Sequence, residues 1–235
     1  FGKKEDFASY PRTMNQDIDK LKKHDCDILF APKSKNEVFN NLDDLKKLTA
    51  GPKGNILCGK IRPGHFDGVL KVVYMLFQLT QPNLSVFGLK DFQQLYLIKQ
   101  MAKIYFPKLK IISAPTIRTK NGLALSSRNS YLDKELIKTA PLFYKTLLDG
   151  INNLKISKNV EETVKYITAN LEKNNFLVNY VSFLTSELEN IRKSNISTIQ
   201  KIFFTLNVTK KFGTLPFAGI ARSAFIATVI LRDLV

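Results

Sequence analysis

Strand-like and helix-like segments alternate along residues 26–115, and this alternation limits the possible folds more than any other feature of the sequence. Short apolar runs bounded by Pro, Gly or Asn are typical of buried strands, and longer stretches with apolar positions at helical spacing are typical of amphipathic helices. The order predicts an α/β fold in which helices cover a parallel sheet. Strands are expected at 26–32, 83–88 and 109–115, a tight turn followed by a helix within 62–82, and a helix at 91–106.

The residues that precede and separate these elements are more polar. The segment SYPRT (9–13) predicts a turn that leads into a helix from about Asn15 to Lys23. A loop and a weak helix are expected over 34–48, before a stretch rich in Gly and Pro at 49–55.

The pattern changes after the segment TKNGLALSSRN (119–129), where long helical stretches replace the short alternating elements. This change predicts a second, smaller α+β domain, so that the first domain covers 1–117 and the second covers 118–235. In the second domain helices are expected at about 132–154 and 159–174, strands at 177–184 and 202–208, and a buried strand or short helix at 223–231.

The composition is that of a folded, soluble protein, with 44% hydrophobic and 11% aromatic residues. No apolar run is long enough to cross a bilayer, since the most apolar one (223–231) is bounded by Arg222 and Arg232. The two cysteines, Cys26 and Cys58, have no metal-type spacing. We therefore expect reduced thiols in a cytoplasmic protein that has no membrane partner.

The net charge of +16 raises the alternative of a basic nucleic-acid-binding module. The lysines, however, are scattered through every segment, and no basic run is interleaved with aromatic residues. The chain is also rich in Lys, Asn and Ile together, a bias that base composition can produce without selection for a partner. The charge is compatible with binding of small anions, and we expect no nucleic-acid partner.

The segment VFGLKDFQQL (86–95) carries more chemistry than a strand-to-helix connection needs. It follows a predicted parallel strand, and ligands of such folds bind at the carboxyl edge of the sheet. Gly88 lets a ligand approach the backbone, the helix start offers free N–H groups to an anion, and Lys90 adds a cation suited to phosphate. Gln94 would face the same side as Lys90 and Asp91. The segment indicates a phosphate or nucleotide site, with helix capping by Asp91 as the structural alternative.

A second cluster, GLALSSRN, combines two hydroxyls and an arginine in a segment that begins with small residues. Ser126, Ser127 and Arg128 could hydrogen-bond phosphate oxygens from a flexible loop that closes over them. The structural alternative is a Ser–Asn turn in which Asn129 or Ser130 caps the next helix.

A third cluster, RPGHF (62–66), places Arg62 and His65 on either side of a Pro-Gly turn, just before an amphipathic helix. An arginine beside a histidine is suited to binding a carboxylate, and the histidine could act as an acid or a base. A lone histidine is more often structural, and this alternative stays open.

Taken in order, the blocks SYPRT, LCGKIRPGHFDGV, FGLKDFQQL and PTIRTKNGLALSSRN resemble successive motifs of the pantoate–β-alanine ligase (pantothenate synthetase) family. The match in order and spacing runs from residue 1 to about 150, and several ordered blocks are more specific than any one alone. The resemblance implies a Rossmann-like nucleotidyltransferase fold of the adenylate-forming type, related to class I aminoacyl-tRNA synthetases. It also implies a homodimeric ligase that uses ATP and Mg²⁺ to join pantoate to β-alanine through a pantoyl-adenylate.

The resemblance assigns roles to individual residues, although it assigns no metal ligand. Lys90 would bind the ATP phosphates, Asp91 would lie near the ribose or the pantoate, and Gln94 would bind pantoate. Arg62 and His65 would lie at the edge of the pocket, on the pantoate side. The catalytic residues would be Lys90, Ser126, Ser127 and Arg128, and the ATP contacts would be Gly88, Leu89, Lys90, Asp91, Ile117, Leu125, Ser126, Ser127 and Arg128.

The chain departs from the family pattern at several positions. Leu89 and Cys58 stand where the family usually has Glu. The sequence starts at the phenylalanine of the family's NPxQF block, so the family's first strand and its His-x-Gly-His phosphate site do not occur in it. Two hypotheses stay open: a ligase seen without its N-terminal segment, and a catalytically impaired relative that keeps the fold and some nucleotide binding.

Overall fold

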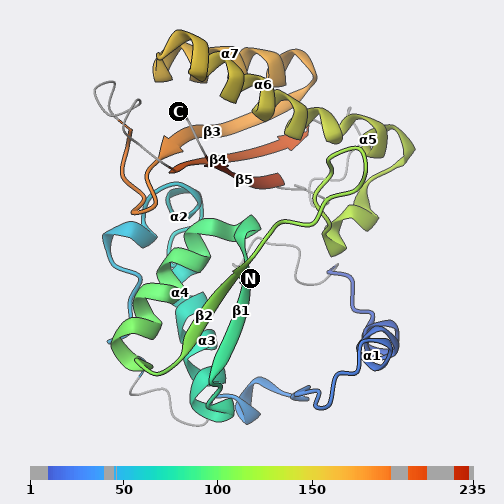
Figure 1. Cartoon of the computed structure of the whole chain (residues 1–235). Coiled ribbons are helices and arrows are strands. Elements are labelled where there is room, and N and C mark those ends of the chain that lie inside the picture. Colours follow the sequence, from blue (N-terminus) through green and yellow to red (C-terminus); the bar gives the residue numbers. More distant parts are fainter. Residues whose placement is uncertain (1–9, 40–44, 46, 192–200, 211–224, 233–235) are drawn as a thin grey trace.

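The computed structural model describes residues 10–39, 45, 47–191, 201–210 and 225–232, the last two ranges as backbone only. The elements form two groups (Figure 1). The lower group in the figure contains a parallel two-stranded sheet with its helices, and the upper group contains an antiparallel three-stranded sheet under a pair of long helices. Among the helices in these residues, none is both long enough and apolar enough to cross a membrane.

The lower group is the expected strand–helix–strand unit. The strands β1 (Leu84–Gly88) and β2 (Lys110–Ala114) are parallel neighbours, and the helix α4 (Phe92–Tyr105) connects them. The preceding helix, α3 (His65–Thr80), packs beside α4 and shares one hydrophobic core with it. The prediction of an α/β fold with a helix-covered parallel sheet is therefore confirmed.

Side chains alternate between the two faces of this sheet, as the strand period of two requires. Phe87 and Ile111 join the core that α3 and α4 form. Val86 and Ile112 lie on the opposite face, where they are 57% and 37% exposed. The helices contribute most of the buried apolar surface, through Phe66, Leu70, Phe77, Leu97, Ile98 and Met101.

The buried strand predicted for CDILFAP (26–32) is wrong. The helix before it, α1 (Met14–Lys23), forms as expected, but the chain that follows takes up no strand conformation. Ile28, Leu29 and Phe30 are 84%, 46% and 49% exposed. An apolar run favours burial, but a strand also needs a neighbour to satisfy its N–H and C=O groups. Among the described strands, β1 and β2 pair only with each other.

The helical elements described between α1 and α3 are short. Within the described residues, the weak helix expected over 34–48 is reduced to the single turn η1 (Lys35–Glu37) and a 3-10 conformation at Leu45. The turn η3 (Pro52–Gly54) and the one-turn helix α2 (Cys58–Ile61) follow.

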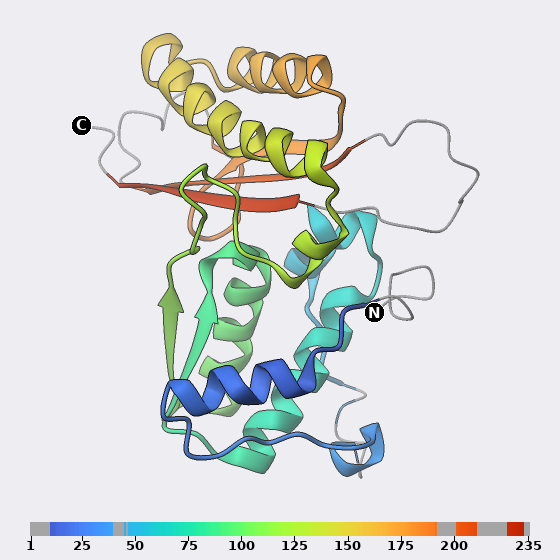
Figure 2. The same cartoon turned by 90° about the vertical axis from the view of Figure 1, so that its right-hand side faces the viewer.

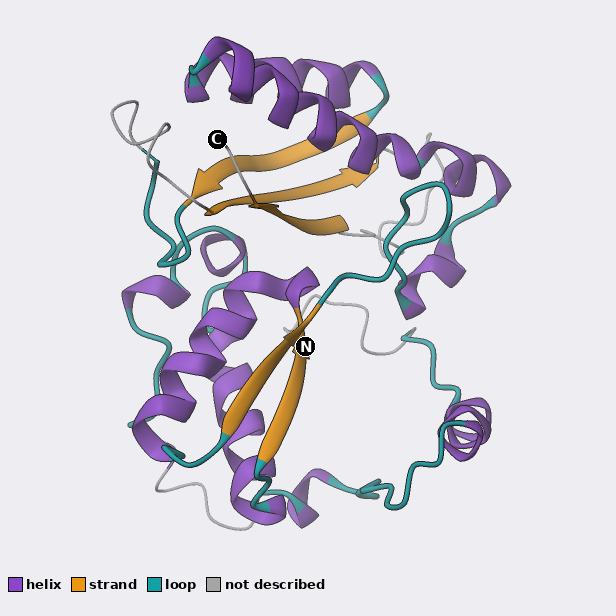
Figure 3. Cartoon of the chain, in the orientation of Figure 1, coloured by secondary structure: helices purple, strands orange, loops and turns teal. Residues whose placement is uncertain are grey.

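The upper group corresponds to the expected α+β part of the chain. Its antiparallel sheet has the order β3-β4-β5, formed by β3 (Phe176–Leu184), β4 (Lys201–Lys210) and β5 (Phe225–Arg232). The helices α6 (Pro141–Ser157) and α7 (Val160–Lys173) pack against each other and cover one face of this sheet (Figure 3). The domain boundary itself stays a prediction.

One predicted helix is interrupted. Instead of one helix over 132–154, the short helix α5 (Lys134–Thr139) ends before Pro141, which begins α6. Proline lacks an N–H group and its ring clashes with the carbonyl four residues earlier, so a helix accepts it in the first turn but not in its middle. Further along α6, Gly150 permits a close approach to α7, because a Cβ there would collide with Ile167.

The antiparallel sheet lies across the carboxyl edge of β1 and β2 (Figure 2), and β5 lies against the turn η4 (Leu89–Asp91). Leu184 and Leu188, at the end of β3 and in the turn after it, pack on Phe92 at the start of α4. The Lys53 ammonium donates a hydrogen bond to the Leu188 carbonyl at 3.0 Å. The second sheet is therefore held above the edge at which parallel sheets bind their ligands.

Candidate functional site

Two of the three predicted clusters leave the parallel sheet at the same edge. Gly88 and Ala114, the last residues of β1 and β2, are partners in the sheet register. The segments that follow them therefore start side by side. After β1 the chain forms η4, in which Lys90 and Asp91 are half-buried. The structure thus brings the GLKD turn next to the start of the PTIR segment.

The first residue of the GLKD turn, Gly88, has open space beside its backbone within the described part of the chain. Gly88 has ordinary extended backbone (φ −73°), and among the described residues the atom nearest to a Cβ placed on it would be the Lys90 backbone nitrogen, at 4.0 Å. Asp91 occupies the N-cap position of α4, but its side chain makes no capping hydrogen bond. The structural alternative for Asp91, helix capping, is therefore wrong.

Two adjacent glutamines in the first turn of α4 lie in different surroundings. Gln93 is buried, and its Nε2 donates hydrogen bonds to the carbonyls of Lys53 and Ile56, both at 2.9 Å. Gln94 is only half-buried. Gln93 therefore holds the neighbouring loop on α4, and Gln94 is the more accessible member of the pair.

The chain after β2 forms a short hairpin. Leu125 N–H donates to the Ile117 carbonyl at 2.9 Å, and Thr119 N–H donates to the Leu123 carbonyl at 2.8 Å. Gly122 closes the turn with a positive φ of 93°, a conformation that favours glycine. The side chains of Ile117 and Leu125 are 61% and 55% exposed. Two residues expected at the nucleotide are thus paired through their backbones and turn their side chains to solvent.

Arg118 links this hairpin to α6 through contacts with both. Its guanidinium carbon lies 3.8 Å from the centroid of the Tyr144 ring, and its Nη1 donates to the Gly122 carbonyl at 3.2 Å. Burial lowers the pKa of Arg118, while the charge and hydrogen bonding of Tyr144 act in the opposite direction. The sequence alone did not single out this arginine, because its aromatic partner lies in α6, 26 positions further along the chain.

The SSRN segment forms a compact turn, η5 (Ser127–Tyr131). The Ser126 Oγ accepts a hydrogen bond from Arg128 N–H at 3.3 Å and so caps the turn. The Ser130 Oγ donates to the Ser127 carbonyl at 2.8 Å. Hydrogen bonds within the turn therefore fix the backbone that carries the predicted phosphate-binding side chains.

The capping role considered for Asn129 or Ser130 is wrong. The next helix, α5, is capped by Asp133, whose carboxylate accepts a hydrogen bond from Leu136 N–H at 2.8 Å. Asn129 instead donates to the Ala124 carbonyl at 3.0 Å, across the base of the loop.

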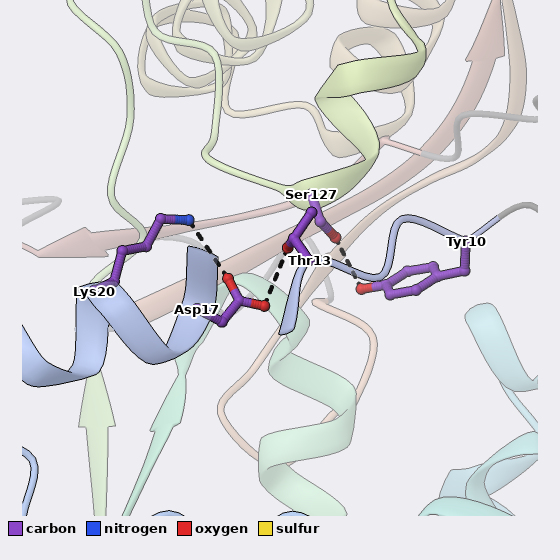
Figure 4. Close-up of polar contacts among 5 residues, drawn as sticks. All are labelled: Tyr10, Thr13, Asp17, Lys20 and Ser127. Carbon is purple, nitrogen blue, oxygen red and sulfur yellow. Dashed lines mark hydrogen bonds and ion pairs between the residues drawn. The ribbon is translucent and has the colours of Figure 1, made fainter. Parts of the chain in front are cut away.

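A residue far away in the sequence completes this cluster. The Tyr10 hydroxyl lies 2.8 Å from the Ser127 Oγ (Figure 4), and the Arg128 guanidinium carbon lies 5.1 Å from the centroid of the Tyr10 ring. Tyr10 belongs to the SYPRT segment, just before α1. Sequence reasoning treated this segment only as a turn and a family block, because a contact between residues 117 positions apart leaves no local pattern.

The RPGHF cluster is joined internally. Arg62 Nη1 lies 2.9 Å from His65 Nε2 and 4.0 Å from the Cys58 Sγ. Because a guanidinium group only donates hydrogen bonds, the His65 Nε2 must accept, which puts the proton of the neutral ring on Nδ1. Gly64, with a left-handed φ of 75°, turns the chain into α3. In Figure 1, α3 and α4 both begin at the end of their unit that faces the antiparallel sheet.

Comparison with known proteins identifies a family whose model matches most of the chain. The family described as "Pantoate-beta-alanine ligase" matches residues 1–213. A pantothenate synthetase of Acinetobacter baumannii is 41% identical over 181 residues, which cover 77% of this chain and 64% of that protein. One of Psychrobacter cryohalolentis is 40% identical over 205 residues, covering 86% of this chain and 70% of that protein. The chain thus spans less than two thirds of the length of the Acinetobacter relative.

Solved structures show the same likeness. A crystal structure of pantothenate synthetase from Thermus thermophilus has a TM-score of 0.83 and 30% identity, and covers 97% of this chain and 78% of that one. A pantoate-β-alanine ligase from Francisella tularensis, complexed with "Beta-gamma ATP" and β-alanine, has a TM-score of 0.59 and 29% identity, with 96% and 72% covered.

Proposed function

The chain belongs to the pantoate-β-alanine ligase family, and from this premise we propose that its protein condenses pantoate with β-alanine to pantothenate at the expense of ATP. The reaction would pass through a pantoyl-adenylate and release pyrophosphate and then AMP. One observation carries the proposal beyond the family match. The pairing of Gly88 with Ala114 starts the lysine-bearing turn and the hairpin of the SSRN segment side by side at one sheet edge.

The residues of the GLKD turn and of the SSRN segment are suited to ATP. Lys90 supplies an ammonium on a flexible stem for the phosphates, and Ser127 and Arg128 supply a hydroxyl and a planar guanidinium that can bind phosphate oxygens in pairs. Gly88 leaves room for a ligand to approach the backbone, because no atom of the described residues crowds the position of its missing Cβ. The exposed side chains of Ile117 and Leu125 offer apolar surface to the base. The Francisella ligase was solved with "Beta-gamma ATP", which supports the same choice of nucleotide here.

In the first step, the pantoate carboxylate would attack the α-phosphate of ATP and displace pyrophosphate. Negative charge then builds on the phosphoryl oxygens and on the leaving group. Preorganised cations and donors lower the barrier most where such charge develops. We assign this role to Lys90, Ser126, Ser127 and Arg128, with Leu89 and Asp91 lining the nucleotide.

Mg²⁺ would enter as MgATP, bound to the phosphates of the nucleotide. Within the described residues, no three His, Cys, Asp or Glu side chains gather as a metal-binding group. This fits Mg²⁺, which keeps several waters and is commonly held by substrate phosphates with one or two carboxylates. Asp91, whose carboxylate does not cap α4, is the acidic side chain of the GLKD turn that could contribute. The ion would supply positive charge for the phosphoryl oxygens.

In the second step, the neutral amine of β-alanine would attack the acyl carbon and release AMP. This step needs mainly an oriented amine beside an activated carbonyl, so positioning supplies most of the catalysis. We place pantoate against Gln94, the accessible member of the glutamine pair, with Arg62 and His65 at the edge of the pocket. The bond between Arg62 and His65 holds the guanidinium in one orientation for a carboxylate.

The test is AMP formation from ATP, pantoate and β-alanine, with the Lys90→Ala variant beside the wild type. We expect pantoate-dependent AMP formation that falls by about 100-fold or more in Lys90→Ala, the scale of losing one charged transition-state contact. Lys103→Ala, on an exposed position of the same helix, is the matched control and should keep full activity. A wild type that binds ATP but forms no AMP would instead support the impaired-relative hypothesis.

We further propose a homodimer that acts in the cytoplasm, where its nucleotide substrate is available. Light scattering of the purified protein should give twice the chain mass, and a monomer at micromolar concentration would contradict this.

A further inference from the structure

We propose that Tyr10 is a positioning residue of the phosphate site, and that it orients the Ser127 hydroxyl and the Arg128 guanidinium together. This inference rests on the proposed function for its kinetic readout. One side chain makes both contacts: its hydroxyl lies 2.8 Å from the Ser127 Oγ, and its ring faces the Arg128 guanidinium carbon at 5.1 Å. These are two of the four side chains assigned to charge stabilisation.

The hydrogen bond can decide where the Ser127 proton points. A serine hydroxyl has one O–H donor and two acceptor lone pairs. A phenol is the more acidic of the two hydroxyls, so Tyr10 is the better donor and Ser127 the better acceptor. When Tyr10 donates, Ser127 keeps its own proton for a phosphate oxygen. Without Tyr10, the Ser127 hydroxyl rotates among several orientations, and only some of them face the phosphate.

The ring acts on the neighbouring residue. A guanidinium group over an aromatic face is attracted by the ring quadrupole and keeps its N–H donors in the plane of the group for other acceptors. Arg128 can therefore be held by Tyr10 and still present its donor edge to an anion. Its backbone is already fixed, because Arg128 N–H is bonded to the Ser126 Oγ. Tyr10 thus contacts the side chains of Ser127 and Arg128, while the hydrogen bonds of the turn fix their backbone.

The segment that carries Tyr10 is itself restrained. Tyr10 precedes Pro11, and the residue before a proline is limited to extended conformations. Three residues on, the Thr13 Oγ1 donates to the Asp17 carboxylate at 3.1 Å, and the Asp17 N–H donates to the Thr13 carbonyl at 2.9 Å (Figure 4). Lys20 adds an ion pair with Asp17 at 3.5 Å. The first turn of α1 therefore holds residues 10–13 on one side while Tyr10 contacts the SSRN segment on the other.

A positioning role and a merely structural one predict different results. The contact lies near the surface, where single substitutions change stability little. Tyr10→Phe removes the hydroxyl and keeps the ring, whereas Tyr10→Ala removes both. We expect Tyr10→Phe to lower kcat/KM for ATP by about three- to tenfold, the range of one lost hydrogen bond, with the thermal midpoint nearly unchanged. Tyr10→Ala should lower it several-fold further.

The experiment is a double-mutant cycle of Tyr10→Phe and Ser127→Ala, with kcat/KM for ATP as the readout. If Tyr10 acts through Ser127, Tyr10→Phe has no further effect once Ser127 is alanine. Tyr166→Phe, an exposed tyrosine on α7, is the matched control and should leave kcat/KM unchanged. Effects of Tyr10→Phe and Ser127→Ala that multiply independently would overturn the proposal.

A readout without substrate separates this proposal from the proposed function. Trypsin cleaves after Arg128, and its rate can be followed by mass spectrometry. We expect faster cleavage at this bond in Tyr10→Ala than in the wild type or Tyr166→Phe, because Arg128 loses the ring that holds it. An inactive wild type with this pattern would contradict the ligase function but support the positioning role, and an unchanged cleavage rate would contradict the role of the ring.

Discussion

The side-chain amide of Gln93 donates a hydrogen bond to the carbonyl of Lys53 at 2.9 Å, and this contact fastens the start of α4 to a loop that reaches the second sheet. The ammonium of the same lysine bonds the Leu188 carbonyl, in the turn after β3. A single loop thus connects the helix of the candidate nucleotide site with the sheet that lies above it. The adjacent glutamine, Gln94, is only half-buried.

Substitutions of the two glutamines should affect different properties: stability at Gln93 and pantoate binding at Gln94. Gln93→Ala removes the donor from two carbonyls in a buried place and should lower the free energy of unfolding by about 1–3 kcal/mol. Gln94→Ala should leave stability within about 0.5 kcal/mol and raise KM for pantoate instead. Urea unfolding and steady-state kinetics measure the two effects, and a reversed pattern would contradict the assignment.

The close approach of α6 and α7 at Gly150 makes a second prediction. Gly150→Ala places a Cβ against Ile167, which is fully buried, and should destabilise the protein by about 1–3 kcal/mol. Gly68→Ala on α3 is the matched control, since no atom lies within 4 Å of its added Cβ. There the gain in helix propensity should stabilise by about 0.5–1 kcal/mol. Urea midpoints that shift in the same direction for both variants would contradict the packing described here.

The raised pKa of Tyr96 predicts that the stability of the folded protein depends on pH. Burial raises the pKa of this tyrosine, and the carboxylates of Glu187 and Glu189 raise it further. Because the folded state holds the phenol proton more tightly than the unfolded state, the contribution of Tyr96 is complete below the unfolded pKa of about 10 and is lost as the pH rises through the folded pKa.

Urea midpoints at pH values between about 9 and 11 test this dependence in the wild type and in Tyr96→Phe, across the ordinary tyrosine pKa. The wild type should lose more stability over this range than Tyr96→Phe, and Tyr166→Phe should behave like the wild type. Equal losses in all three proteins would show that Tyr96 is not linked to folding.

The stacking of Arg118 on Tyr144 predicts that a lysine, although it keeps the positive charge, cannot replace Arg118 in holding the hairpin against α6. Arg118→Lys keeps the charge but loses the planar group that covers the ring and bonds the Gly122 carbonyl. We expect KM for ATP to rise several-fold, because the hairpin that leads to the SSRN segment is less well fixed. Tyr144→Phe keeps the aromatic face and should have a smaller effect. A larger effect of Tyr144→Phe would mean that the hydroxyl, and not the ring, holds the arginine.

Local patterns in the sequence predicted what depends on local forces. The helical spacing of residues 62–82 and the apolar runs at β1 and β2 place their own elements, because each signal lies within a few residues. The strand prediction for CDILFAP (26–32) was wrong for the opposite reason. A buried strand there would need a neighbouring strand as its partner, and the apolar run itself does not specify one. Pro141 carried a local signal for a helix break, and the apolar periodicity on both sides of it concealed that signal.

The residues of the candidate site also fall into two groups: those that local sequence motifs indicated and those that only the structure revealed. The ordered motifs GLKDFQQ and LSSRN indicated the residues that carry charge and hydroxyls. The residues that hold them, Tyr10, Gln93 and Arg118, each act through a partner in a different element. Their roles follow only from the three-dimensional arrangement.

Transfer of an oxygen isotope can show whether the pantoate carboxylate attacks the α-phosphate of ATP, as we propose. Pantoate labelled with ¹⁸O in its carboxylate is incubated with the protein, MgATP and β-alanine, and the products are analysed by mass spectrometry. The account predicts one ¹⁸O atom in AMP, because the bridging oxygen of the adenylate comes from the carboxylate and stays with phosphorus. Label in inorganic phosphate, or turnover with unlabelled AMP, would contradict it.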